Sequence, residues 1–153
     1  MVIREVTQAP EKQRIARLVL EALPDWFGNT EAREDYIRRS AGLPFFAAYD
    51  GARPVGFICL KQTGRDTAEL SVMGVLREYH RMGAGRGLFE SAREAAVRMG
   101  YSFLQVKTVQ MGKYADYDDT NRFYRALGFK EFEVFPTLWD EDNPCQVYVM
   151  ALR

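Results

Sequence analysis

Residues 75–90 hold the side chains whose types and spacing point most directly to chemistry, because glycine and arginine recur there over a short distance. An apolar run leads into this segment, and from Leu88 to Met99 apolar side chains recur with the period of an amphipathic helix. The glycines allow the backbone to approach a ligand, and the first N–H groups of a helix, which have no internal partner, favour an anion. Arg81 and Arg86 add positive charge. The segment therefore predicts a phosphate-binding turn between a strand and a helix.

Two common nucleotide-binding motifs do not fit this segment. A Walker loop needs Gly-Lys-Ser/Thr, but Gly85 is followed by Arg86 and Gly87, so no hydroxyl is placed to hold magnesium. A dinucleotide fingerprint needs a third glycine where Leu88 stands and an acidic residue about 20 positions later, where the chain is apolar at 103–104. The phosphate ligand is therefore not expected to bind through either motif.

Residues 80–86 instead resemble the pyrophosphate loop of the GNAT superfamily of acyl-CoA-dependent N-acyltransferases, in which the pattern is Arg/Gln-x-x-Gly-x-Gly/Ala. His80 replaces the leading Arg/Gln, and the residues that fit are Arg81, Gly83, Ala84, Gly85 and Arg86. Residues 121–129 resemble the second signature of the family, a helix that ends in Phe/Leu-Tyr-x-x-x-Gly-Phe. Both signatures occur at the family's separation, and the resemblance spans nearly the whole chain.

The resemblance implies that acetyl-CoA is the cosubstrate and that no metal takes part. In the family the pantetheine arm lies along the strand before the loop, where strand pairing splays apart, and the loop binds the diphosphate. The implied coenzyme-binding residues are Met73, Gly74, Val75, Arg81, Met82, Gly83, Ala84, Gly85, Arg86, Gly87 and Asn121. Relatives often carry an asparagine where Tyr117 stands, and Asn121, one turn before Tyr124, is the candidate to replace it. His80 is expected to make a phosphate or structural contact.

Transfer of an acyl group from a thioester to an amine needs an acid that protonates the departing thiolate. Tyr124 matches the signature tyrosine that does this in many relatives, and a phenol with a pKa of about 10 is protonated at neutral pH. The alternative is a purely structural role for Tyr124 in the apolar face of its helix.

The same reaction needs a base, because an alkyl amine is mostly protonated at neutral pH. Glu69 falls where histone-acetylating members of the family carry their glutamate base, and strand alternation places it on the same face as Ser71, Met73 and Val75. The alternative is a solvated charge at the start of a strand. Gln105 occupies another position at which relatives carry a base, but an amide cannot accept the proton.

Three segments that mix aromatic side chains with carboxylates are candidates for acceptor binding, namely residues 24–27, 114–119 and 136–142. A cationic amine would find opposite charge and aromatic faces there. The candidate contact residues are Trp26, Phe27, Tyr117 and Trp139. Solvated acidic loops that merely aid solubility are the alternative, so the sequence predicts a small-molecule or peptide amine without identifying it.

Hydrophobic patterns predict the elements that position these residues. Helices are expected after Pro10, at 30–40, after the glycine-rich turn and from 119 or 120 to 127, and strands at 2–6, 45–49, 55–61, 68–75, 101–109, 129–135 and 146–152. A turn at 24–28, a polar loop at 110–119 and a Pro- and Asp-rich loop before 146 should connect them. This order predicts an α/β (α+β) GNAT fold, a mixed central sheet of six to seven strands flanked by about four helices. We expect a single domain, residues 1–153.

Composition disfavours several classes of protein. The formal net charge is +0 and the pI is about 6.6, which argues against a general binder of nucleic acid or of anionic membranes. No apolar run approaches the roughly 20 residues of a membrane span, and residues 1–5 do not resemble a signal peptide. Two cysteines and one histidine make neither a usual zinc site nor a disulfide framework, so Cys59 and Cys145 are interpreted as small apolar residues in a reducing cytoplasm.

The leading hypothesis is a cytoplasmic N-acetyltransferase that moves an acetyl group from acetyl-CoA to a primary amine by direct attack in a ternary complex, because no cysteine is placed to form an acyl-enzyme. Glu69, directly or through water, is the predicted base, and Tyr124 is the predicted acid. The alternatives are a non-catalytic acyl-CoA-binding regulatory or interaction module on the same fold, and a nucleotide-dependent enzyme. The exposed ends of the sheet and the habits of the family suggest a homodimer.

Overall fold

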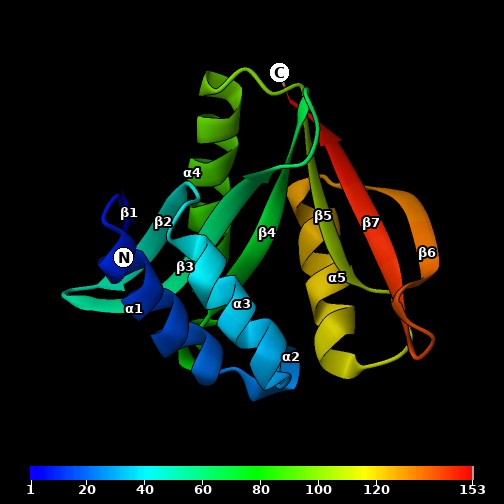
Figure 1. The fold of residues 1–153 in the computed structure, drawn as a ribbon, viewed down its shortest axis with the longest axis horizontal. Coiled ribbons are helices and arrows are strands. Elements are labelled where there is room, and N and C mark those ends of the chain that lie inside the picture. Colours follow the sequence, from blue (N-terminus) through cyan, green and yellow to red (C-terminus); the bar gives the residue numbers. More distant parts are fainter. Residues whose placement is uncertain (153) are drawn as a thin grey trace.

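One mixed sheet organises the chain (Figure 1). The computed structural model describes residues 1–152, and within them the strand order is β1-β2-β3-β4-β5-β7-β6. Neighbouring strands are antiparallel except β4 and β5, which are parallel. The strands are β1 (Val2–Glu5), β2 (Phe45–Asp50), β3 (Arg53–Gln62), β4 (Thr67–Val75), β5 (Phe103–Val109), β6 (Lys130–Asp140) and β7 (Asn143–Ala151).

Helices cover both faces of this sheet. Those found within residues 1–152 are α1 (Ala9–Glu21), α2 (Pro24–Phe27), α3 (Thr30–Ser40), the 3-10 helix η1 (Arg77–Tyr79), α4 (Ala84–Arg98) and α5 (Ala115–Leu127). The Cβ position of Gly74 points at α1, whereas that of Gly56, on the neighbouring strand, points at α4, so the two helices lie on opposite faces. α3 packs along α1, and α5 packs against β5. The predicted α/β class with a mixed sheet is confirmed.

The core is densest where α4 crosses the centre of the sheet. Leu88, Ala92 and Ala96 follow the helical period and are fully buried as α4 packs on β2 and β3. Between these strands Phe45 and Phe57 stack with ring centroids 5.1 Å apart. Burial of each large apolar side chain contributes about 1.5–3 kcal/mol, so this packing fixes the start of α4 relative to the end of β4.

β4 and β5 separate partway along their length. They pair from Thr67↔Phe103 to Glu69↔Gln105 and no further. Beyond that point β4 continues beside β3 alone and β5 continues beside β7 alone, and the two strands diverge toward the end of the sheet at which α2 lies (Figure 1). We call the region between residues 70–75 of β4 and residues 106–109 of β5 the strand split. Backbone groups that would join the two strands are left facing it.

β4 contains a bulge at Ser71. Its register with β3 passes from Cys59↔Val72 to Leu60↔Leu70, so Ser71 has no residue opposite to it. A bulge bends its strand and redirects the neighbouring side chains, which suits a strand that is leaving its partner. The uninterrupted alternation expected along this strand is therefore wrong at Ser71, whose buried Oγ has no hydrogen-bond partner within residues 1–152.

Two connections differ from their predictions. Residues 24–28 were expected as a turn, but Pro24 begins the short helix α2, because its fixed φ suits a first helical position. This raises the number of α-helices from about four to five in the part of the chain described. The expected loop before residue 146 is largely strand, because Asp140↔Asn143 extends the pairing of β6 with β7. Its Asp140 side chain accepts hydrogen bonds from Asn143 and stabilises the hairpin end.

α5 begins earlier than predicted, at Ala115 rather than at 119 or 120. Asp116 and Asp118 lie in its first turn, where carboxylates interact favourably with the helix dipole. Asp118 also accepts a hydrogen bond from the Gly112 N–H at 2.7 Å. The acidic residues that were interpreted as a loop therefore stabilise a helix start.

Candidate active site

The end of β4 directs backbone groups into the strand split. The Leu76 N–H donates to the Val55 carbonyl at 2.9 Å, and hydrogen-bonded pairs alternate along antiparallel strands. Gly74 therefore bonds to β3, whereas the polar groups of Met73 and Val75 face the split. The expected backbone contact from Gly74 does not fit this alternation. Packing accounts for a glycine at this position, because a Cβ on Gly74 would lie 2.9 Å from a side-chain atom of α1.

The N-terminus of α4 carries no side-chain cap. Gly83, its N-cap residue, has φ 86° in the left-handed region, and the first helical bond joins the Gly87 N–H to the Gly83 carbonyl at 3.0 Å. The N–H groups of Gly85 and Arg86 consequently have no intrahelical partner. α3 is different, because the Asn29 side chain caps it. The exposed start of α4 therefore has the geometry of an anion-binding site.

Positive charge surrounds this helix start. Arg81 adopts φ 63°, a left-handed conformation that is uncommon for a residue with a side chain and recurs at functional sites. Arg81, Met82 and Arg86 are exposed, whereas the methyl group of Ala84 is buried in the core. Ala84 can therefore reach a ligand only through its backbone.

Two of the glycines in this turn are required by packing. A Cβ on Gly85 would lie 3.0 Å from Phe123 Cζ and 3.1 Å from Met73 Cε, and a Cβ on Gly87 would lie 3.2 Å from Ile3 Cγ1. Gly83 alone among the three combines a positive φ with open space around its Cβ position. All three glycines were predicted to allow the backbone to approach a ligand. Gly85 and Gly87 have a second reason to be glycine, because neighbouring side chains fill the space that a Cβ would need.

His80 makes the structural contact that was one of its two expected roles. Its Nε2 lies 2.6 Å from the Val75 carbonyl oxygen, and its ring meets Trp26 edge to face with centroids 5.8 Å apart. The imidazole therefore holds the end of β4 against α2.

Tyr124 lies on α5 and is 8% exposed. Burial, and then the neighbouring Tyr117, Glu69 and Tyr36, raise the pKa of its phenol well above the usual value. The ring packs against Phe129 and Tyr148, and within residues 1–152 its hydroxyl has no hydrogen-bond partner. The group is thus protonated at neutral pH and has its proton available to donate.

Glu69 lies at the closed end of the strand split and is 9% exposed. Its Oε1 accepts a hydrogen bond from Lys107 Nζ at 2.8 Å, so its environment is not the solvated strand edge of the alternative interpretation. Lys107 was not predicted from the sequence; its signal is that it is the one charged residue of β5. Gln105 donates to Thr63 Oγ1 at 2.8 Å.

Tyr36 on α3 was also missed. The Glu69 carboxylate, after burial, raises the pKa of the Tyr36 phenol as it does that of Tyr124. Groups from α3, β4 and α5 therefore lie close enough for the charge of Glu69 to influence both phenols. No local motif announces Tyr36, because only the fold brings α3 to this place.

Asn121 has a structural role that argues against the expected coenzyme contact. It is fully buried, and its Nδ2 donates to the carbonyls of Val109 at 2.9 Å and Tyr117 at 2.7 Å. Its Oδ1 accepts from the Tyr148 hydroxyl at 2.6 Å. These bonds join α5 to β5 and β7 and leave the amide facing the interior.

The residues expected at the acceptor end come together only in part. Tyr117 donates to the Trp26 carbonyl at 3.0 Å and so joins α5 to α2. Arg77 stacks on Trp26, with its guanidinium 4.6 Å from the ring centroid, and bonds to Asp25 and Asp116. By contrast, Phe27 packs on Tyr36. Trp139 is exposed on β6 and, among the described residues, makes no ring contact with Trp26 or Tyr117.

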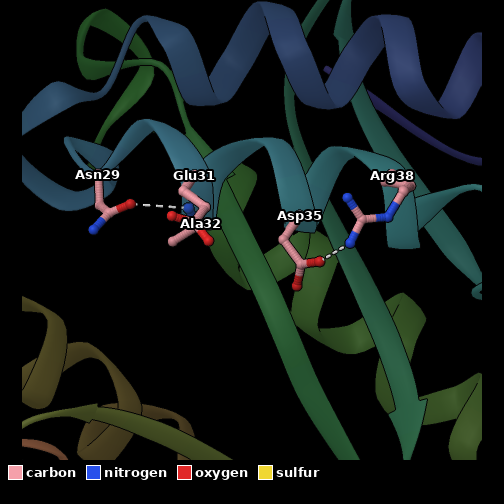
Figure 2. Close-up of a pocket in the computed structure, with 5 residues that line it drawn as sticks. All are labelled: Asn29, Glu31, Ala32, Asp35 and Arg38. Carbon is pink, nitrogen blue, oxygen red and sulfur yellow. Dashed lines mark hydrogen bonds and ion pairs between the residues drawn. The ribbon is translucent and has the colours of Figure 1, made fainter.

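Two cavities lie near this end of the molecule. One, of about 360 Å³, is lined by Asp25, Tyr114, Asp116, Tyr117 and Asn143, so it draws on two of the three predicted acceptor segments and borders the third. The other, also of about 360 Å³, runs along α3 (Figure 2), where Asn29 is occupied in capping and Asp35 pairs with Arg38. The first cavity is the better acceptor candidate, because residues from several elements converge on it.

A comparison with protein-family models decides the family. The model described as "Acetyltransferase (GNAT) family" matches residues 11–129, which include the strand split, the start of α4 and Tyr124. The chain belongs to the GNAT acetyltransferase family. It is accordingly an acyltransferase, as the sequence predicted.

A relative and two solved structures of other proteins, to which this GNAT protein is similar, agree with the assignment. The Bacillus subtilis protein named uncharacterized N-acetyltransferase YsnE is 24% identical over 105 residues, which cover 69% of this chain and 68% of that one. A putative GNAT acetyltransferase from Desulfovibrio desulfuricans has a TM-score of 0.83 at 19% identity and covers 99% of both chains. The structure of yncA, a putative acetyltransferase from Salmonella typhimurium solved with acetyl-CoA, has a TM-score of 0.75 at 16% identity, covering 99% of this chain and 94% of that one. The GNAT fold is therefore confirmed.

Two further findings concern residues 1–152 of the GNAT protein. No helix in this part of the chain is long and apolar enough to cross a membrane. Nor do three or more His, Cys, Asp or Glu side chains within it gather in a way that could hold a metal ion.

Proposed function

We propose that this protein is a cytoplasmic N-acetyltransferase that transfers an acetyl group from acetyl-CoA to a primary amine by direct attack in a ternary complex. The strand split carries the proposal. It has the backbone groups of Met73 and the N–H of Val75 along one side, Glu69 at its closed end and the uncapped start of α4 at its open end, while the Val75 carbonyl is bonded to His80. The acetyl-CoA in the structure of yncA supports the choice of coenzyme.

In this proposal the coenzyme's diphosphate binds the free N–H groups at the start of α4, with Arg81 and Arg86 supplying charge. The pantetheine arm runs along Met73 and Val75 toward Glu69. Binding along this strand holds the thioester still and makes the attack effectively unimolecular. Glu69, directly or through water, removes the proton of the amine, and Tyr124 protonates the thiolate as it departs.

The acceptor is proposed to enter beside Tyr117 and Trp26, from the cavity that Asp25 and Asp116 border. Asp25 and Asp116 already pair with Arg77, so the aromatic rings of Tyr114 and Tyr117 are proposed to favour the cationic amine, on a small molecule or on a peptide. Trp139, exposed on β6, is retained only as a more distant contact for a larger acceptor.

Ligand binding and turnover together test this proposal. A ligand that binds only the folded state raises the melting temperature, so we expect acetyl-CoA and CoA to raise it more than ATP or NAD. A panel of amines should then release free CoA from acetyl-CoA. Stabilisation by ATP or NAD alone would favour a nucleotide-dependent enzyme, and acetyl-CoA binding without turnover of any amine would favour a non-catalytic regulatory module.

Replacing Gly83 by alanine is expected to raise the KM for acetyl-CoA by about tenfold. A side chain in the left-handed region costs about 1–2 kcal/mol, and relaxing that strain turns the free N–H groups of α4 away from the diphosphate. Gly100→Ala is the matched control, because Gly100 follows the other end of the same helix with φ 88° and equally open surroundings. Steady-state kinetics should give a normal KM for the control, and an equal rise in both variants would contradict a diphosphate site at Gly83.

Direct attack predicts that neither cysteine carries the acetyl group. Cys59 and Cys145 are fully buried, and burial raises the pKa of both thiols, that of Cys145 to about 11. At pH 7.5 the thiolate fraction is then below about one in a thousand. Mass spectrometry after incubation with acetyl-CoA alone should find no acetylated cysteine, and initial rates should follow sequential kinetics. Parallel double-reciprocal plots would instead indicate an acyl-enzyme.

A homodimer is proposed through β6, an edge strand along which Phe132, Phe135, Leu138 and Trp139 are exposed. Exposed apolar side chains on one edge favour association. Sedimentation equilibrium of the wild type and of Phe132→Lys tests this, because a monomeric wild type would remove the proposal.

A further inference from the structure

An ion pair crosses the strand split at its closed end. Lys107 Nζ lies 2.8 Å from Glu69 Oε1, and it reaches from β5 to β4. The last register pair joining these strands is Glu69↔Gln105, and Lys107 lies two residues further along β5, on the same face as Gln105. The side chains are 27% exposed for Lys107 and 11% for Glu69, so solvent screens the pair only in part.

We propose that Lys107 is a positioning residue for Glu69, one that holds the carboxylate ionised and in place for the acceptor amine. The inference rests on the proposed role of Glu69 as base. An ammonium bonded to Oε1 leaves Oε2 free to accept a proton from the amine or from a bridging water.

The other groups around Glu69 cannot replace this ammonium. Those that face it from packed elements are the phenols of Tyr36 on α3 and Tyr124 on α5 and the thiol of Cys145 on β7, which its charge influences. Burial raises the pKa of all three, so they are neutral at pH 7. Lys61 stands opposite Glu69 on β3 but is exposed and makes no ion pair with it.

A buried carboxylate that loses its cation binds a proton more readily. Without Lys107 the Glu69 carboxylate would lose the cation that favours its ionised form, and a protonated carboxyl group cannot act as a base.

Carboxyl ¹³C NMR of the glutamate-labelled protein tests the inference without turnover. The signal that is missing from Glu69→Gln identifies Glu69. In Lys107→Met its titration midpoint should move to higher pH by about one pH unit, in Lys107→Arg it should stay near the wild-type value, and in Lys61→Met it should not move. An unchanged midpoint in folded Lys107→Met would overturn the inference, whatever the activity.

Kinetics then separates this inference from the proposed function. If both hold, Glu69→Gln lowers kcat/KM at least about tenfold, and the acid limb of the pH profile moves upward in Lys107→Met with rescue by Lys107→Arg. A large loss in Glu69→Gln with an unmoved profile in Lys107→Met would overturn the role of Lys107 alone. Wild-type rates in Glu69→Gln would show that Glu69 is not the base, so the ion pair with Lys107 would have no catalytic role.

Discussion

Substitution of Tyr124 by phenylalanine is expected to lower kcat by about a hundred- to ten-thousand-fold and to leave the KM for acetyl-CoA nearly unchanged. The phenol is proposed to donate its proton to the thiolate only as the thioester breaks, and general acids of this kind contribute about that factor. The ring itself keeps its packing against Phe129 and Tyr148 in the variant. Because the hydroxyl makes no hydrogen bond within residues 1–152, its removal leaves no partner unsatisfied.

Initial rates over a range of acetyl-CoA concentrations, with thermal melting as a test of folding, measure this effect. Tyr101→Phe is the control, since Tyr101 is a partly buried tyrosine that packs against the core but lies just before β5, at the end of that strand away from the strand split. Equal rates for Tyr124→Phe and wild type would leave Tyr124 with the structural role that its helix pattern also allows.

The pH profile offers a second check on Tyr124. Burial, and then nearby Tyr117, Glu69 and Tyr36, raise the pKa of its phenol above the usual value of 10.0. The proton is therefore retained throughout the range in which amines are assayed, and Tyr124 should cause no loss of rate below pH 10. A decline in kcat with a midpoint below pH 10 that disappears in Tyr124→Phe would contradict this environment.

Much of the fold was predictable because its signals are local. The period from Leu88 to Met99 predicted α4. Strand-like runs located all seven strands, with bounds within three residues except at the end of β6, which was predicted at 135 and lies at Asp140. The errors occurred where local rules compete. The acidic residues from Asp116 to Asp119 favour a loop by composition, yet two of them stabilise the first turn of α5. Likewise, Pro24 marks both turns and helix starts.

The candidate site was less predictable, because its geometry depends on contacts between distant elements. The resemblance predicted a split between strands, and the structure contains it beyond Glu69. It could not predict that Lys107 would reach across the split, since that requires the parallel register of β4 with β5. The bulge at Ser71 is hidden for a similar reason, because an extra residue is defined only against the partner strand.

Asn121→Ala is expected to lower the free energy of unfolding by about 2–6 kcal/mol. The substitution removes one side chain but leaves two buried groups unsatisfied, namely the carbonyl of Val109 and the O–H donor of Tyr148, whereas the Tyr117 carbonyl keeps the helical bond from the backbone N–H of residue 121. Each unsatisfied buried group costs about 1–3 kcal/mol. A loss of this size approaches the whole stability of a small domain, which is typically about 5–15 kcal/mol.

A graded set of variants separates this structural role of Asn121 from a coenzyme contact. Tyr148→Phe removes only the bond to Asn121 Oδ1 and a weaker one from Arg125, so it should cost about 1–2 kcal/mol, and Gln62→Ala, which loses one exposed bond, should cost less than about 0.5 kcal/mol. Urea unfolding gives these values, and the KM for acetyl-CoA measured on the folded fraction of Asn121→Ala should remain normal. A stable Asn121→Ala with a raised KM would mean instead that the amide turns out of the interior to bind the coenzyme, as the sequence alone had suggested.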